Sequence, residues 1–265
     1  MRNVLTFLLL LFSLLCNGQS PKLFTTDKEL SSSLINQIYQ DRNGFIWIAT
    51  EDGLNRYDGA KFTIYKHEPN NEHSLAHNFV RTVFEDSKGH LLIGTYIGIQ
   101  MYDPATDNFT PLAKLEDTGE TLESNINSFI ERKNGEIWVS GNVLCKLDIK
   151  DHLLTVRKVD IAVTSPGSLF EDKKQNVWMA KGEEGVYQLT PDNQLTLHLS
   201  KDNGYVKSIC EDQRGNIYVG SIRKGLFIYD KERKTFVPID LKEKGELPVC
   251  FLYSGIPNEL YIGTD

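Results

Sequence analysis

Short runs of hydrophobic and aromatic residues recur along the chain and alternate with polar turns that contain glycine. Phe45–Thr50 and Asn216–Gly220 are two of these runs, and both are rich in the β-branched and aromatic side chains that favour strands. Asn43-Gly44 and Arg214-Gly215 stand just before them, and such dipeptides form tight hairpin turns. After residue 20, no stretch carries a long apolar stripe at helical spacing. The pattern therefore predicts an all-β chain of short antiparallel strands.

The runs belong to a longer sequence phrase that occurs six times. Its large central residue marks the period, and these markers are Trp47, Leu92, Trp138, Trp178, Tyr218 and Tyr261. Successive markers are 45, 46, 40, 40 and 43 residues apart, which suits a four-stranded propeller blade better than a helical or solenoid repeat. A β-sandwich would not repeat its sequence at a fixed period. We therefore predict a β-propeller of four-stranded antiparallel blades, with five complete blades and a truncated sixth from a seven-bladed ring. The tryptophans are expected in its core.

The second copy gives the layout expected of one blade. Its four strands are expected at Val80–Glu85, Leu91–Thr95, Ile99–Tyr102 and Phe109–Leu112. The last copy stops at Asp265, in the loop after its second strand, and Lys22–Thr26 resembles a fourth strand with no first three before it. A strand with an unpaired edge is a liability for a natural domain. We therefore expect these 265 residues to be the front part of a longer polypeptide.

The start of the chain predicts export. A basic tip precedes the apolar run Val4–Leu15, which is too short to span a bilayer and fits a secretory signal. Gly18 is a small residue suited to cleavage, and Cys16 offers lipidation as an alternative. The expected division is a signal peptide at residues 1–18 and a β-propeller at residues 19–265, with the mature chain in the periplasm.

Charge and cysteine content narrow the classes of function. The formal net charge is −7, which argues against nucleic acid as a partner because nucleic-acid binding needs a basic face. Three cysteines follow the signal peptide, Cys145, Cys210 and Cys250. An odd number spread over three copies is no disulfide framework, so we expect small buried apolar residues. The sequence indicates no metal site and no cofactor.

The repeated phrase resembles the two-component regulator propeller repeat, D-x-x-G-x-I-W-I-G-T-x-x-G-L-x-x-Y-D. The first copy matches it at Asp41, Gly44, Trp47, Thr50, Gly53, Leu54, Tyr57 and Asp58. The fifth copy matches it at Asp212, Gly215, Gly220, Gly225, Leu226, Tyr229 and Asp230. The third and fourth copies depart from the pattern, since Arg132 replaces the Asp and Lys181 stands where Thr is usual.

This resemblance implies a function for the whole protein. The family forms the periplasmic sensor of hybrid two-component systems, in which propellers precede a membrane helix, a histidine kinase and regulator domains that control transcription. Many of these sensors bind oligosaccharides. The implied role of residues 1–265 is non-catalytic sensing of an oligosaccharide or other small ligand. The resemblance also implies that the full-length protein is anchored in the inner membrane, and it allows a homodimer. Two other classes stay open: an exported propeller enzyme, such as a lyase or glycosidase, and an interaction scaffold.

A ligand is expected on the face of the ring where the copies differ. In a propeller, the loops between second and third strands share one face with the loops between blades. Variable loops on a rigid scaffold often carry function, and here they carry Glu51, Asp52, Tyr96 and Arg223. We expect these side chains to contact a ligand, with Tyr96 stacking on a sugar ring.

A second set of residues lies 11 positions before each marker, where the innermost strand begins. Its polar members are Asn36, Arg81, Asn127 and Lys207, and the fourth copy has Gly167. At the mouth of the central channel these side chains are placed to hydrogen-bond sugar hydroxyls. The alternative is that they bind neighbouring loop backbone and water.

Three other patterns indicate structural roles. The aspartates that open the turn after the first strand are expected to accept backbone amide hydrogen bonds: Asp41, Asp86, Asp172 and Asp212. His67, His73 and His77 are a weak zinc signal, because they lack a cysteine partner or a preset helix. The adjacent carboxylates Glu183-Glu184 diverge on a turn and do not form a glycosidase pair.

Overall fold

The described part of the chain consists of strands. The computed structural model describes residues 23–26, 29–200, 204–241, 247–255 and 259–264. The expected signal peptide and Cys16 lie outside these residues. Within them the chain forms strands β1 to β23 and no helix, and thus no helix there is long and apolar enough to cross a membrane. The all-β prediction is confirmed.

The strands pair into successive sheets in chain order. The first sheet contains β1 (Ile35–Gln40), β2 (Ile46–Thr50), β3 (Gly53–Tyr57) and β4 (Phe62–Tyr65). The second contains β5 (Val80–Glu85), β6 (Leu91–Thr95), β7 (Ile99–Asp103) and β8 (Asn108–Phe109). The third contains β10 (Ser128–Glu131), β11 (Ile137–Ser140), β12 (Leu144–Lys150) and β13 (Leu153–Lys158), with β9 (Lys114–Leu115) added as a parallel fifth strand beside β13.

The remaining sheets continue the series. The fourth contains β14 (Leu169–Glu171), β15 (Val177–Lys181), β16 (Gly185–Leu189) and β17 (Leu195–Ser200). The fifth contains β18 (Val206–Glu211), β19 (Ile217–Ser221), β20 (Gly225–Asp230) and β21 (Thr235–Ile239). The sixth contains β22 (Val249–Tyr253) and β23 (Tyr261–Thr264).

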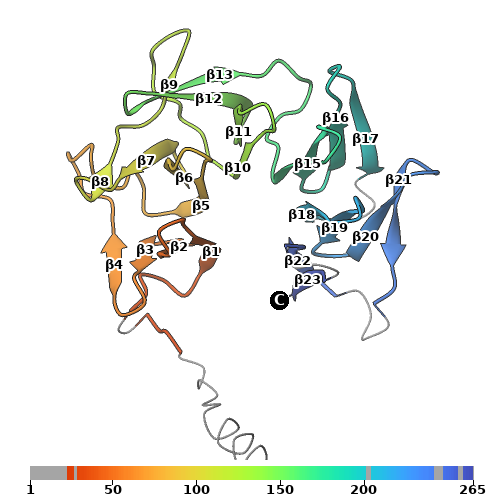
Figure 1. The fold of residues 1–265 in the computed structure, drawn as a ribbon, viewed down its shortest axis with the longest axis horizontal. Coiled ribbons are helices and arrows are strands. Elements are labelled where there is room, and N and C mark those ends of the chain that lie inside the picture. Colours follow the sequence, from red (N-terminus) through yellow and green to blue (C-terminus); the bar gives the residue numbers. More distant parts are fainter. Residues whose placement is uncertain (1–22, 27–28, 201–203, 242–246, 256–258, 265) are drawn as a thin grey trace, which may run out of the picture.

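The sheets follow one another around an arc, each with its first strand on the inner side (Figure 1). The inner strands contact one another in sequence from β1 through β5, β10, β14 and β18 to β22. This arrangement confirms the predicted β-propeller, with five complete blades and two strands of a sixth among the described residues. The seven-bladed ring stays a prediction.

The predicted layout of the second blade is largely confirmed. β5 and β6 have the predicted bounds, and β7 extends one residue further. β8 is shorter than the predicted strand Phe109–Leu112. The Oγ1 atom of Thr110 accepts the amide of Met101 at 3.0 Å in place of a backbone carbonyl, and Pro111 has no N–H to donate. The regular ladder therefore stops at Phe109.

The prediction of a fourth strand at Lys22–Thr26 is wrong for the part that the structure describes. Residues 23–26 form no strand. Instead the ring of Phe24 packs edge-on against Tyr57 and Phe62, with centroids 5.2 and 5.0 Å away. Apolar packing on the first blade, rather than strand pairing, holds this segment.

The hydrophobic core lies between neighbouring blades. The ring of Trp47 in β2 is fully buried, and its centroid lies 4.9 Å from that of Tyr102 in β7. Trp178 in β15 packs in the same way, 5.1 Å from Tyr229 in β20. Trp138 in β11 is also buried. The core role expected of the tryptophans is confirmed, and each blade covers the apolar face of the next.

Candidate ligand-binding face

The turns between first and second strands form one face of the ring, and they are structural. In the fourth blade, Oδ1 of Asp172 accepts the backbone amides of Lys174 and Asn176, each at 2.9 Å. Its Oδ2 atom accepts the side-chain amide of Asn176 at 2.8 Å and the indole N–H of Trp178 at 2.9 Å. Asp41, Asp86 and Asp212 accept amides in the same pattern. The expected capping role of these aspartates is confirmed.

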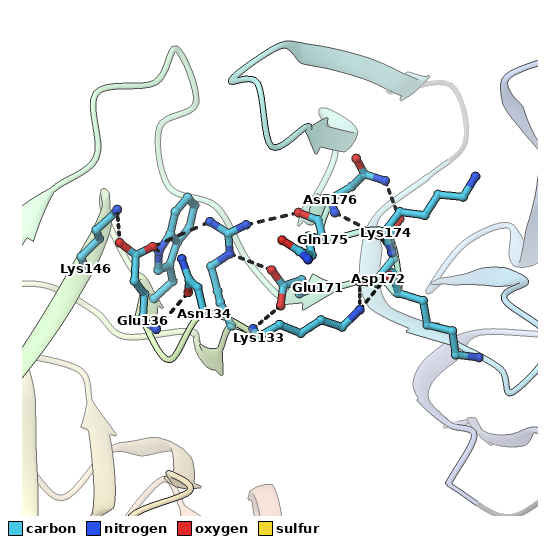
Figure 2. A network of polar contacts seen from close by, with 12 residues as sticks. Lys133, Asn134, Glu136, Lys146, Glu171, Asp172, Lys174, Gln175 and Asn176 are labelled. Atoms are coloured by element: carbon cyan, nitrogen blue, oxygen red, sulfur yellow. Dashed lines mark hydrogen bonds and ion pairs between the residues drawn. The ribbon is translucent and has the colours of Figure 1, made fainter.

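The third blade reaches a similar result with different residues (Figure 2). Arg132 occupies the place of the Asp, and its guanidinium lies 4.5 Å from the ring centroid of Trp138. Glu136 supplies the carboxylate instead and accepts the indole N–H of Trp138 at 3.0 Å. Lys146 also donates to Glu136 at 2.5 Å. Hydrogen bonds from Lys146 and Trp138 lower the pKa of Glu136 to about 2, against the opposing effect of burial.

Glu136 should make the stability of the protein depend on pH. The folded state depresses its pKa from 4.5 to about 2, so its contribution is present above pH 4.5 and is lost as the pH falls towards 2. Glu136→Gln should therefore lower the free energy of unfolding by about 1 kcal/mol at neutral pH, a value discounted for solvent screening of this part-exposed pair. Urea unfolding at several pH values measures this. A difference between wild type and variant that stays constant from pH 7 to pH 3 would contradict it.

The same face carries a set of contacts between blades that the sequence analysis missed. A glutamate ends the inner strand in four blades, and its carboxylate accepts a backbone amide from the turn of the preceding blade. The donor and acceptor pairs are Arg42 and Glu85, Ser87 and Glu131, Lys133 and Glu171, and Lys173 and Glu211. The available signal was a Glu just before the turn's first residue in each of these copies. Figure 2 shows Glu171 in this role.

The opposite face holds a cavity of about 750 Å³ at the mouth of the central channel. It is lined by the beginnings of the inner strands and by nearby loops, including Ser165, Gly182 and Tyr205. Four of the eight residues predicted as ligand contacts line it: Asn36, Arg81, Asn127 and Lys207. The structure thus brings together the set chosen by its place in the repeat.

Two of these four residues also bind the backbone of the next blade. Asn36 Nδ2 donates to the carbonyl of Val80 at 2.7 Å, and Asn127 Nδ2 donates to the carbonyl of Pro166 at 3.1 Å. The two asparagines therefore hold neighbouring inner strands in register at the cavity wall. These bonds agree with the alternative interpretation, in which the two side chains bind neighbouring backbone. They also hold each side-chain amide in a fixed position at the cavity wall.

The other four predicted residues do not line the cavity. Tyr96 is 54% exposed, and its ring lies 6.1 Å from that of Phe79, which in turn lies 5.9 Å from the guanidinium of Arg81. Tyr96 is therefore an exposed aromatic ring that contacts the cavity residue Arg81 only through Phe79. Arg223 pairs with Glu183, a lining residue, at 3.2 Å.

The first-blade carboxylates lie apart from this group. Asp52 forms an ion pair with Lys66 at 2.5 Å and accepts a hydrogen bond from Asn78 at 3.1 Å. The amide of Glu51 donates to the carbonyl of Leu34. Both contacts hold the loops around the first blade, and neither residue lines the cavity.

Several residues that line the cavity were not predicted from the sequence. Tyr205 lies over Gly182, where a Cβ atom would be 3.0 Å from the tyrosine ring. Lys181 points to the same region and pairs with Glu184 at 2.7 Å. In the sequence, Lys181 stood out only as a departure from the repeat. A charged residue at a position where the repeat has a structural Thr could have indicated a lining residue. Tyr205 lies in the loop before β18, where the repeat does not fix which side chains face the cavity.

Two of the histidines that gave a weak zinc signal in the sequence lie next to backbone carbonyls. Among the residues that the structure describes, no group of three or more metal-ligating side chains is placed to hold an ion. His67 and His73 instead lie within hydrogen-bond distance of the carbonyls of Leu75 and Phe109.

The cysteines are buried to different degrees. Burial raises the pKa of the Cys145 and Cys210 thiols to about 11. Cys250 is only partly buried, which differs from the prediction for it.

Comparison with known proteins agrees with this architecture. Residues 29–52, 74–96 and 200–223 match the family described as two component regulator propeller. The chain is 39% identical over 83 residues to Histidine kinase P4 of Formosa agariphila. That match covers 29% of this chain and 6% of the kinase.

Solved structures share the fold at low sequence identity. One is the extracellular domain of a protein of B. thetaiotaomicron assigned to a hybrid two component system, with a TM-score of 0.74 and 17% identity over 93% of this chain and 36% of that domain. Another is virginiamycin B lyase of Staphylococcus aureus, with a TM-score of 0.67 and 13% identity over 92% of this chain and 80% of the lyase. The chain spans only a small part of the kinase and about a third of the extracellular domain. Three segments of the chain therefore match the two-component regulator propeller family, and the chain folds as a β-propeller.

Proposed function

We propose that this propeller is the extracytoplasmic ligand-sensing segment of a hybrid two-component sensor kinase, and that it recognises an oligosaccharide. The observation that carries the proposal is the cavity at the mouth of the central channel, with Tyr96 as an exposed aromatic surface beside it. Sugars bind proteins through hydrogen bonds to their hydroxyls and through stacking on aromatic rings, and this face offers both.

The signalling part of the proposal draws on the relatives. Three segments of the chain match the family of two-component regulator propellers, and the protein of Formosa agariphila that matches over 83 residues is a histidine kinase. In this scheme residues 1–265 perform no catalysis. Ligand bound between the inner strands and the loops changes how the propeller sits against the rest of the polypeptide, and a downstream kinase responds. A ligand shifts such an equilibrium only as far as it binds one arrangement better than the other.

Titration calorimetry against a panel of oligosaccharides tests the proposal directly. At least one glycan should release or absorb heat in a saturable, one-site manner. Tyr96→Ala should weaken that binding by about fivefold, since an aromatic stacking contact contributes about 1 kcal/mol. Tyr261→Ala is the matched control, because Tyr261 is 47% exposed in β23 and does not line the cavity. Absence of binding by every glycan would refute the sugar-sensing role.

A further inference from the structure

The charged residues at the central cavity are unevenly paired. Two cations there have carboxylate partners, since Lys181 lies 2.7 Å from Glu184 and Arg223 lies 3.2 Å from Glu183. Those two pairs are neutral as units. Arg81 and Lys207 also line the cavity, and neither has an acidic side chain within ion-pair distance among the described residues. The residues that line the cavity thus include three cations, Arg81, Lys181 and Lys207, against two carboxylates, Glu183 and Glu184, and two of the three cations have no carboxylate partner within the described part of the chain.

The surroundings of these two cations favour an anion. The guanidinium of Arg81 lies 5.9 Å from the ring centroid of Phe79, and a guanidinium beside a ring still presents its in-plane N–H donors to a ligand. Lys207 is exposed where it lines the cavity, so its ammonium group can reach a ligand there.

The sign of the charge here runs against that of the whole protein. The chain has 29 Lys and Arg residues and 36 Asp and Glu residues, giving a net charge of −7. An excess of basic residues in the cavity is thus a local feature. A basic pocket on an acidic protein focuses anions to that point and repels them elsewhere.

We propose that the ligand of this propeller is an anionic oligosaccharide, whose carboxylate or sulfate groups bind Arg81 and Lys207. The inference rests on the proposed sensing function and names its ligand class. Arg81 belongs to β5 and Lys207 to β18, and the inner strands β10 and β14 stand between them. Two cations on separate blades fit an extended ligand with more than one anionic group better than a single inorganic anion. Arginine suits the planar, bidentate recognition of a carboxylate or sulfate.

Calorimetry with three tetrasaccharides separates the outcomes: cellotetraose as the neutral probe, tetragalacturonate as the carboxylate probe and a chondroitin sulfate tetrasaccharide as the sulfated probe. At least one anionic probe should bind, and its affinity should fall as the salt concentration rises. The double variant Arg81→Met with Lys207→Met should weaken that binding at least tenfold. Inorganic sulfate should bind far more weakly than the oligosaccharide.

The control is Lys150→Met with Lys231→Met, which removes the same charge at exposed positions that do not line the cavity. It should leave affinity within twofold. If the cavity variant melts at a lower temperature, Arg81→Gln with Lys207→Gln replaces it. Binding of cellotetraose alone would overturn the anionic ligand and leave the sensing role standing. Equal loss in control and cavity variants, or sulfate binding as tightly as the tetrasaccharides, would also overturn it. No binding by any probe would refute both.

Discussion

Gly185→Ala should destabilise the protein by roughly 3–5 kcal/mol, the range of the most disruptive single substitutions. Gly185 opens β16 with a φ of +124°, a backbone conformation that residues with a Cβ atom rarely adopt. A Cβ atom there would lie 1.4 Å from the carbonyl oxygen of Leu199 in β17. That oxygen belongs to the paired strand, where Val186 opposes Leu199. Relief therefore requires the two strands to separate, which would open the outer half of the fourth blade.

Gly135→Ala is the matched control for this effect. Gly135 also has a positive φ, +83°, but no atom lies within 4 Å of the position that its Cβ would take. Backbone strain alone should cost about 1 kcal/mol there. Urea unfolding followed by tryptophan fluorescence measures both variants. An equal loss of unfolding free energy in the two variants would mean that the close approach of β17 to Gly185 does not contribute to the effect.

The sequence repeat was sufficient to predict the blades because a propeller uses the same local chemistry in every copy. The bounds of β5 and β6 followed from the alternation of strand residues and glycine turns. β8 ended early because one side chain, that of Thr110, took over a backbone bond. The added strand β9 depends on pairing with β13, whose residues lie about 40 positions further along the chain. Pro111 was a local signal for the early end of β8, whereas the pairing of β9 with β13 has none, so the repeat could not predict β9.

In the candidate site too, residues on the repeated strands could be predicted and residues in loops could not. Asn36, Arg81, Asn127 and Lys207 were found because the repeat fixes their register on the inner strands, and register alone decides which side chains reach the channel mouth. Loop residues have no such register. Glu51 and Asp52 were therefore placed at the site although they serve the first blade, whereas Tyr205 was missed.

Asp172→Ala should also have a large effect, with a loss of about 3 kcal/mol. This carboxylate is 5% exposed and accepts four hydrogen bonds. Alanine leaves those donors buried without an acceptor, and each unpaired buried group carries a desolvation cost. Asp172→Asn should fall between wild type and alanine, because an amide keeps one acceptor oxygen but turns an N–H₂ group toward the remaining donors. Asp148→Ala, at an exposed position in β12, should change stability by less than about 0.5 kcal/mol.

The indole signals of the three tryptophans locate this loss within the structure. The N–H of Trp47 donates to Asp41, that of Trp178 to Asp172, and that of Trp138 to Glu136. Hydrogen exchange measured by NMR should therefore find all three protected in the wild type. In Asp172→Ala the Trp178 indole should exchange much faster, while the other two keep their carboxylates and exchange at rates set by global stability. An unchanged Trp178 rate would show that the indole N–H does not depend on Asp172 for its protection.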